Sequence, residues 1–151
     1  MEREQRISAG AIVIQEGKIL LVRYNDRHGK SFLVGPGGGV LIKESTAKAA
    51  IREVKEETNL EVSYGKVIFI EDLLANRHRI TKIWFLCNLV GGKLTKTQDA
   101  TNEGIVDVGW YRRDRLNNEI VYPSVILSHD WDAFYQDNWQ VIYKELQEVD
   151  F

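Results

Sequence analysis

Residues 38–60 constrain the fold more than any other segment, because they join a glycine-rich turn to a densely charged helical pattern. The turn reads Gly-Pro-Gly-Gly-Gly over residues 35–39. Residues 45–58 then carry apolar side chains at helical spacing, and Ser45 or Thr46 is a suitable N-cap. The pattern therefore predicts a helix that starts shortly after a turn whose backbone carries almost no side chains.

Three glutamates of this helix lie close together and beside its buried face. Successive helical residues rotate by about 100°, so Glu53, Glu56 and Glu57 share an arc of about 100°. The adjoining arc carries the small and apolar side chains that must face the core, namely Ala47, Ala50, Ile51, Val54 and Thr58. Partly buried unit charges about 4 Å apart repel by about 4 kcal/mol at an effective dielectric constant of about 20. The helix is therefore unfavourable unless positive charge neutralises its carboxylates.

Two interpretations of this charge cluster are open at this point. In the first it is a solvated acidic face, neutralised by Lys48, Arg52 and Lys55. In the second it binds Mg²⁺ or Mn²⁺, which prefer oxygen ligands and usually keep several waters and substrate phosphates. The glycines at residues 37–39 favour the second, since they leave backbone carbonyls and amides open to a metal or a phosphate. The lysine and Ser/Thr of a P-loop are absent, which argues against ATP binding of that kind.

Short apolar, β-branched runs surround the helix. We expect strands over residues 7–14, 19–24, 32–34, 60–70, 80–90 and 104–111, a polar loop over 95–103 and a helical turn over 113–118. Residues 130–147 repeat apolar side chains at every third or fourth position, which predicts an amphipathic helix. Strands and helices mixed in one short chain predict a layered α/β (α+β) domain.

Composition narrows the class of protein. A chain of 151 residues with 44% hydrophobic and 28% charged residues is large enough for one domain with its own core. The net charge of −2 gives no support for generic nucleic-acid binding, which shows a basic excess. No apolar run approaches the roughly 18 residues of a membrane span. Cys87 is the single cysteine and the first residues lack a signal-peptide pattern, so we expect a cytoplasmic protein.

The spacings within residues 38–60 closely resemble the signature of the Nudix hydrolases. The matching positions are Gly38, Glu44, Arg52, Glu53, Val54, Glu56, Glu57 and Leu60, and Pro36-Gly37 resembles the family's entry turn. Asn59 departs from the pattern, because glycine is usual there; asparagine tolerates positive φ, so we expect a slightly costlier turn with the chemistry intact. The order of strands is also similar to the family. The resemblance implies a Nudix-like α/β/α sandwich around a mixed β-sheet, with residues 1–151 forming one hydrolase domain.

The resemblance also implies a reaction and a set of site residues. Nudix hydrolases use Mg²⁺, with Mn²⁺ as an alternative, to split a diphosphate linkage in a nucleoside diphosphate derivative such as a nucleotide sugar, ADP-ribose or a dinucleoside polyphosphate. Carried over to this chain, the metal ligands are Glu53, Glu56, Glu57 and the Gly38 carbonyl, with Arg52 orienting the carboxylates and Gly37, Gly38, Gly39 and Glu44 supporting the loop and the substrate phosphates. Metal ions neutralise the diphosphate oxygens and lower the pKa of the attacking water.

Several functional points stay open from the sequence. The general base is either a helix glutamate such as Glu53 or an acid on a later loop, for which Glu103 is our candidate and Asp99 the next. Two alternatives to the diphosphate hydrolase are a nucleoside triphosphate pyrophosphatase of the clean-up type and a non-catalytic nucleotide-sensing module. The retained glutamates favour an enzyme with a small nucleotide-type substrate. Residues 130–147 pack on the sheet or form a homodimer contact, and Lys82 lies at a solvated sheet edge or meets phosphate.

Overall fold

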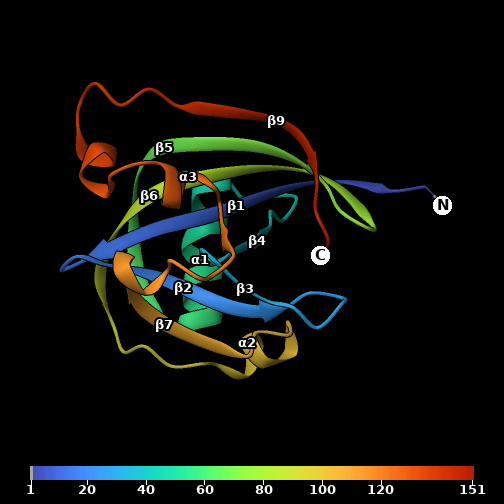
Figure 1. Ribbon diagram of the computed structural model, residues 1–151, viewed down its shortest axis with the longest axis horizontal. Coiled ribbons are helices and arrows are strands. Elements are labelled where there is room, and N and C mark those ends of the chain that lie inside the picture. Colours follow the sequence, from blue (N-terminus) through green and yellow to red (C-terminus); the bar gives the residue numbers. More distant parts are fainter. Residues whose placement is uncertain (1) are drawn as a thin grey trace.

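The computed structural model describes residues 2–151, and within this range the chain forms one curled mixed β-sheet with one long helix packed on it (Figure 1). The strands are β1 (Glu4–Gln15), β2 (Lys18–Asn25), β3 (Ser31–Val34), β4 (Gly37–Gly39), β5 (Leu60–Leu74), β6 (His78–Gly92), β7 (Asp107–Arg112), β8 (Val121–Tyr122) and β9 (Ile142–Glu148). The helices are α1 (Thr46–Thr58), α2 (Gln98–Asn102) and α3 (Val125–Ser128), with the 3₁₀ turns η1 (Arg113–Arg115) and η2 (Trp131–Tyr135).

Strand β1 lies at the centre of the sheet and pairs with three other strands. The strand order is β8-β3-β2-β1-β6-β5-β9, with β4 paired to β1 and β7 paired to β2. On one edge β1 runs parallel to β6, from Glu4 opposite His78 to Val13 opposite Cys87. Its other edge is divided, because residues 8–10 pair with β4 and residues 14–15 pair with β2. The glycine strand β4 is therefore held against the middle of the sheet.

Alternating side chains of β1 build a core on each face of the sheet. Ala9, Ala11 and Val13 pack with Ala50 and Val54 of α1, as the period of two along a strand requires. Ile12 points to the opposite face, where α3 and η2 contribute Ile126, Trp131 and Phe134 among others. These two cores confirm the prediction of a layered α/β domain with a mixed sheet.

The predicted amphipathic helix over residues 130–147 is wrong. These residues form the short turn η2 and then strand β9, which runs parallel to β5. The indole N–H of Trp131 donates to the Ile126 carbonyl at 2.9 Å, and that of Trp139 donates to the Ile68 carbonyl at 3.1 Å. The two tryptophans thus occupy separate positions in the core instead of one face of a helix. Pairing with the edge of β5 makes residues 142–148 a strand despite the helical spacing of their apolar side chains.

The other expectations hold with small shifts. Helix α1 has Ser45 as its N-cap, whose side chain accepts a hydrogen bond from the Lys48 N–H at 3.1 Å. The expected polar loop over 95–103 contains the short helix α2, capped by Thr97. No helix in residues 2–151 combines the length and the apolar character needed to cross a membrane.

Asn59 ends α1 in the left-handed conformation, with φ +65°, as its departure from the family pattern predicts. Its side-chain amide donates to the Lys93 carbonyl at 2.9 Å. We expect Asn59→Ala to lower the free energy of unfolding by about 1 kcal/mol, because alanine lacks the short polar side chain that makes this φ tolerable and the hydrogen bond to the Lys93 carbonyl is lost. For a chain of this size that corresponds to a fall in Tm of about 2–4 °C.

Asn59→Gly is the control, because glycine accepts the same φ without strain. Calorimetric unfolding of both variants should show the smaller fall for glycine, with turnover retained in each. An alanine variant as stable as wild type would show that the asparagine side chain contributes nothing at this cap.

Candidate active site

Helix α1 places two of its glutamates in the protein interior. Glu53 is 8% exposed and Glu57 is 2% exposed, whereas Glu56 reaches solvent. Glu57 has one oxygen, Oε1, that is the single buried side-chain N or O atom in residues 2–151 without a hydrogen-bond partner. Burial raises the pKa of Glu57 well above its usual range, and the neighbouring Glu53 carboxylate raises it further. The site therefore holds a buried carboxyl group with one oxygen that no other group contacts by a hydrogen bond.

Strand β4 brings bare backbone against these carboxylates. A β-carbon on Gly38 would lie 2.6 Å from Oε1 of Glu53, and one on Gly37 would lie 2.5 Å from the Ala9 carbonyl oxygen. Because both distances are shorter than side chains allow, only glycine lets β4 lie between β1 and α1. The glycine turn and the glutamates that the sequence singled out are thus brought together.

Arg52 connects residues 39–44, which precede α1, to the carboxylates of the helix. Its guanidinium donates to Glu44 at 2.7 and 2.9 Å, to Glu53 at 3.0 Å, to Glu56 at 3.1 Å and to the Gly39 carbonyl at 3.0 Å. Arg52 lowers the pKa of Glu44, while the pKa of Arg52 is itself raised, first by Glu44. Arg52 thus orients the carboxylates of Glu44, Glu53 and Glu56, and these carboxylates neutralise its positive charge. A guanidinium suits this role because its hydrogen-bond donors lie in one plane and point in several directions.

Glu103 lies near the same cluster, at the end of α2. It lines the cavity that contains Glu57 and also the adjoining open cleft that contains Glu53 and Glu56. Helix α2 is held there by Thr97, whose hydroxyl donates to the Glu56 carbonyl and accepts from the Ala100 N–H. Asp99, the second candidate base, lines neither space.

The carboxylates fit a hard divalent cation in donor chemistry, although they do not form a finished cage. Within residues 2–151, no three His, Cys, Asp or Glu side chains gather closely enough to form a metal site by themselves. Arg52 holds Glu53 and Glu56, and Gly38 lies beside the Glu53 carboxylate. Mg²⁺ needs only one or two carboxylates when waters and substrate phosphates complete its shell. An unpartnered buried carboxylate oxygen beside a second carboxylate suits such an ion.

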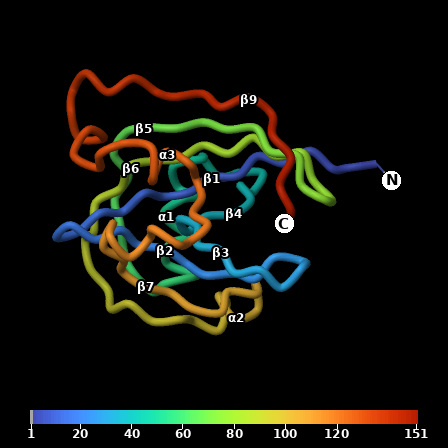
Figure 2. Tube along the Cα trace, in the orientation of Figure 1, coloured from blue at the N-terminus to red at the C-terminus, as the bar shows by residue number. Residues whose placement is uncertain are grey.

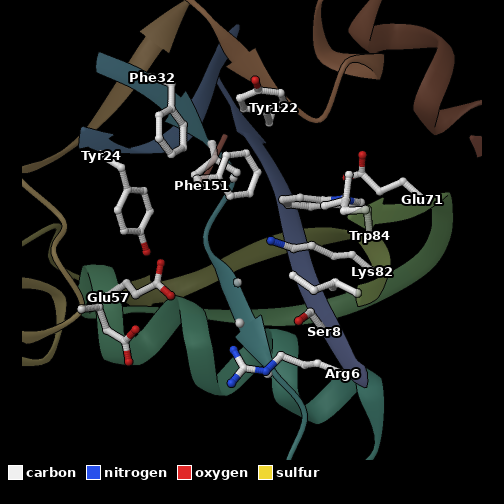
Figure 3. A pocket seen from close by; sticks show the side chains of 18 of the residues that line it. Arg6, Ser8, Tyr24, Phe32, Glu57, Glu71, Lys82, Trp84, Tyr122 and Phe151 are labelled. Atoms are coloured by element: carbon white, nitrogen blue, oxygen red, sulfur yellow. The ribbon is translucent and has the colours of Figure 1, made fainter. Parts of the chain in front are cut away.

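A cavity of about 270 Å³ extends from the glutamates across the sheet (Figure 3). Its lining includes side chains that sequence reasoning did not single out, namely Arg6, Tyr24, Glu71, Tyr122 and Phe151. Lys82 also lies here and not at a solvated edge, because β6 pairs with β1 in a register that sets Lys82 opposite Ser8. A lysine inside the apolar run 80–90 was the one signal in the sequence for this cavity.

Comparisons with known proteins agree with this geometry. A family model described as "NUDIX domain" matches residues 4–128. An ADP-ribose pyrophosphatase of Methanocaldococcus jannaschii is 28% identical over 126 residues, which cover 82% of this chain and 68% of that protein. Nudix hydrolase 5 of Arabidopsis thaliana is 38% identical over 88 residues, which cover 56% of this chain and 29% of that protein.

Solved structures share the fold. A crystal structure of a NUDIX hydrolase from Nitrosomonas europaea has a TM-score of 0.73 at 14% identity, covering 99% of this chain and 82% of that one. An ADP-ribose pyrophosphatase from Streptococcus suis has a TM-score of 0.63 at 24% identity, covering 94% and 98%.

Proposed function

This chain belongs to the Nudix family, whose hydrolases act on pyrophosphate linkages, and from that premise we propose that it hydrolyses the diphosphate linkage of a nucleoside diphosphate derivative with a bound divalent cation. Nucleotide sugars, ADP-ribose and dinucleoside polyphosphates form the substrate class. The relatives named ADP-ribose pyrophosphatases support this class.

The observation that carries the proposal is the buried Glu57 carboxylate with an unpartnered oxygen, next to Glu53 and to glycine backbone. Glu53, Glu56, Glu57 and the Gly38 carbonyl are the groups that would hold Mg²⁺ or Mn²⁺. Such an ion, when bound, neutralises diphosphate oxygens and lowers the pKa of a water. Arg52 keeps the carboxylates in position, and the glycines at residues 37–39 with Glu44 shape the phosphate side of the site.

Glu103 is our proposed general base. It borders both the cavity and the cleft, so its carboxylate can reach a water beside a diphosphate that lies across Gly38. Glu53 is the alternative base, but it already accepts a hydrogen bond from Arg52 at 3.0 Å, so its carboxylate is engaged.

Hydrolysis of a substrate panel tests the function. Nucleotide sugars, ADP-ribose, dinucleoside polyphosphates and nucleoside triphosphates are incubated with Mg²⁺ or Mn²⁺, and phosphorus NMR identifies the products. We expect two monophosphate-bearing products from a diphosphate derivative, and no turnover when a chelator removes the metal. Release of pyrophosphate from triphosphates alone would favour the clean-up pyrophosphatase. Metal binding without any turnover would favour a sensing module.

The whole chain, residues 1–151, is proposed to be one such hydrolase domain, although the family match ends at residue 128. Strand β9 supports this, since it extends the same sheet beyond that point. A cytoplasmic location and a homodimer remain predictions.

A further inference from the structure

The chain beyond residue 128, where the family match ends, returns to the cavity. After β9, the Val149 N–H donates to the Leu74 carbonyl at 3.1 Å, and Asp150 forms an ion pair with Arg27 at 3.4 Å. Figure 2 shows the trace turning away from β9 and crossing toward β3. This path places the ring of Phe151 in the lining of the cavity.

Phe151 extends a row of near-parallel aromatic rings. Tyr24 stacks on Phe32 with ring centres 5.6 Å apart and planes at 17°, and Phe32 stacks on Phe151 at 5.2 Å and 22°. Tyr122 contacts the edge of Phe151 at 5.3 Å and 66°. Phe151 remains 38% exposed, so part of its ring is open. A flat ligand ring can continue the row, because offset stacking is favourable between planar rings.

Lys82 supplies a free hydrogen-bond donor in the same space. Its ammonium lies 4.3 Å from the ring centre of Trp84, and Figure 3 shows it directed into the cavity near Phe151. No hydrogen bond or ion pair joins it to another of residues 2–151. The nearby Glu71 is already engaged, since Trp84 donates to it at 2.6 Å and Gln147 at 3.3 Å. Because an ammonium only donates, the ligand atom facing it must be an acceptor.

We propose that Phe151 and Lys82 form a nucleobase subsite, in which a base stacks on the open part of Phe151 and presents a ring nitrogen or carbonyl oxygen to Lys82. The inference rests on the proposed function, because the same cavity contains Glu57 and glycines 37–39, where the diphosphate is proposed to lie. Specificity for the nucleoside then comes partly from a segment outside the matched family domain.

Binding of nucleoside monophosphates tests the subsite. AMP, GMP, CMP and UMP are titrated calorimetrically with Mg²⁺ present, and ribose 5-phosphate serves as the matched ligand without a base. We expect the tightest-binding nucleotide to lose about tenfold in affinity in Phe151→Ala and in Lys82→Met, in keeping with the usual strength of base stacking and of a charged hydrogen bond. Ribose 5-phosphate should change less than about twofold in either variant.

Matched controls are Tyr64→Ala, which removes an exposed aromatic ring outside the cavity, and Lys48→Met, which removes an exposed charge on α1. Both should bind the nucleotide like wild type, and circular dichroism checks that all variants fold.

Three results would overturn the proposed subsite. The first is a wild-type protein that binds no nucleotide more tightly than ribose 5-phosphate. The second is a Phe151→Ala variant that binds the nucleotide as tightly as or more tightly than wild type, and the third is a Lys82→Met variant that binds both ligands equally more weakly. The last would assign Lys82 to phosphate. Monophosphates have no diphosphate to cleave, so this outcome is independent of turnover.

Discussion

Glu57→Gln is expected to reduce turnover by about 10²- to 10³-fold while leaving the fold intact. Glutamine keeps the side-chain volume but removes the negative charge proposed to hold the metal, and lost charge stabilisation of a transition state is of this order. The unpartnered oxygen of Glu57 is deeply buried, and a glutamine at this position cannot supply the lost negative charge. Initial rates on the best substrate of the panel measure the effect.

The metal-free stability of the same variant provides an independent readout. The folded-state pKa of Glu57 is raised, so its contribution to stability is fully present below the ordinary glutamate pKa and is lost as pH rises through the raised value. Metal-free wild type should therefore lose stability between acidic and neutral pH, and Glu57→Gln should lose less. Mg²⁺ should raise the Tm of wild type only, since a ligand stabilises the state that binds it.

Glu61→Gln is the matched control, because Glu61 is exposed and forms only a 3.5 Å contact with Lys55. It should behave like wild type in rate and in its response to Mg²⁺. A near-wild-type rate for Glu57→Gln would remove Glu57 from the proposed ligands.

Arg52→Lys is expected to lower kcat/KM by about 10- to 100-fold, the usual effect of losing a group that orients metal ligands. The guanidinium contacts Glu44, Glu53, Glu56 and the Gly39 carbonyl at once. A lysine ammonium keeps the charge but cannot span these acceptors. Weaker apparent affinity for Mg²⁺, measured from the metal dependence of the rate, should accompany the loss.

Arg112→Lys serves as the control for this substitution. Arg112 is exposed and pairs only with Asp114, at 3.2 Å, so its replacement should change neither rate nor metal dependence. If Arg52→Lys retained full activity, charge alone would suffice and the fork geometry would have no role.

The signature segment could be predicted well because its information is local. Helical rotation places Glu53 and Glu57 by the buried stripe, and the structure finds both buried. The left-handed Asn59 followed from its position at a helix end. Bare backbone beside Glu53 followed from the run of glycines, and the structure shows that a β-carbon on Gly38 would clash there.

The rest of the cavity depends on pairings between distant strands. Phe151 meets Phe32 only because β9 adds to β5 and directs the chain back, and nothing in the residues near Phe151 indicates this. Residues 130–147 carried a helical period that tertiary pairing overrode. Lys82 could be seen as unusual in its strand, but its direction depends on the register with β1.

The parallel pairing of β1 with β6 also affects the order in which the protein can assemble during synthesis. His78 follows its partner Glu4 by 74 residues. At a synthesis rate of about 5–20 residues per second, the first residue of β6 is therefore made roughly 4–15 s after the first residue of β1. The residues of α1 have been synthesised by then, and as long as its glutamates are in water their mutual repulsion is weak. Glu53 and Glu57 leave water when α1 packs on β1, β4 and β5. Their crowding therefore opposes the packing of this helix, and a divalent cation bound at that moment would favour it.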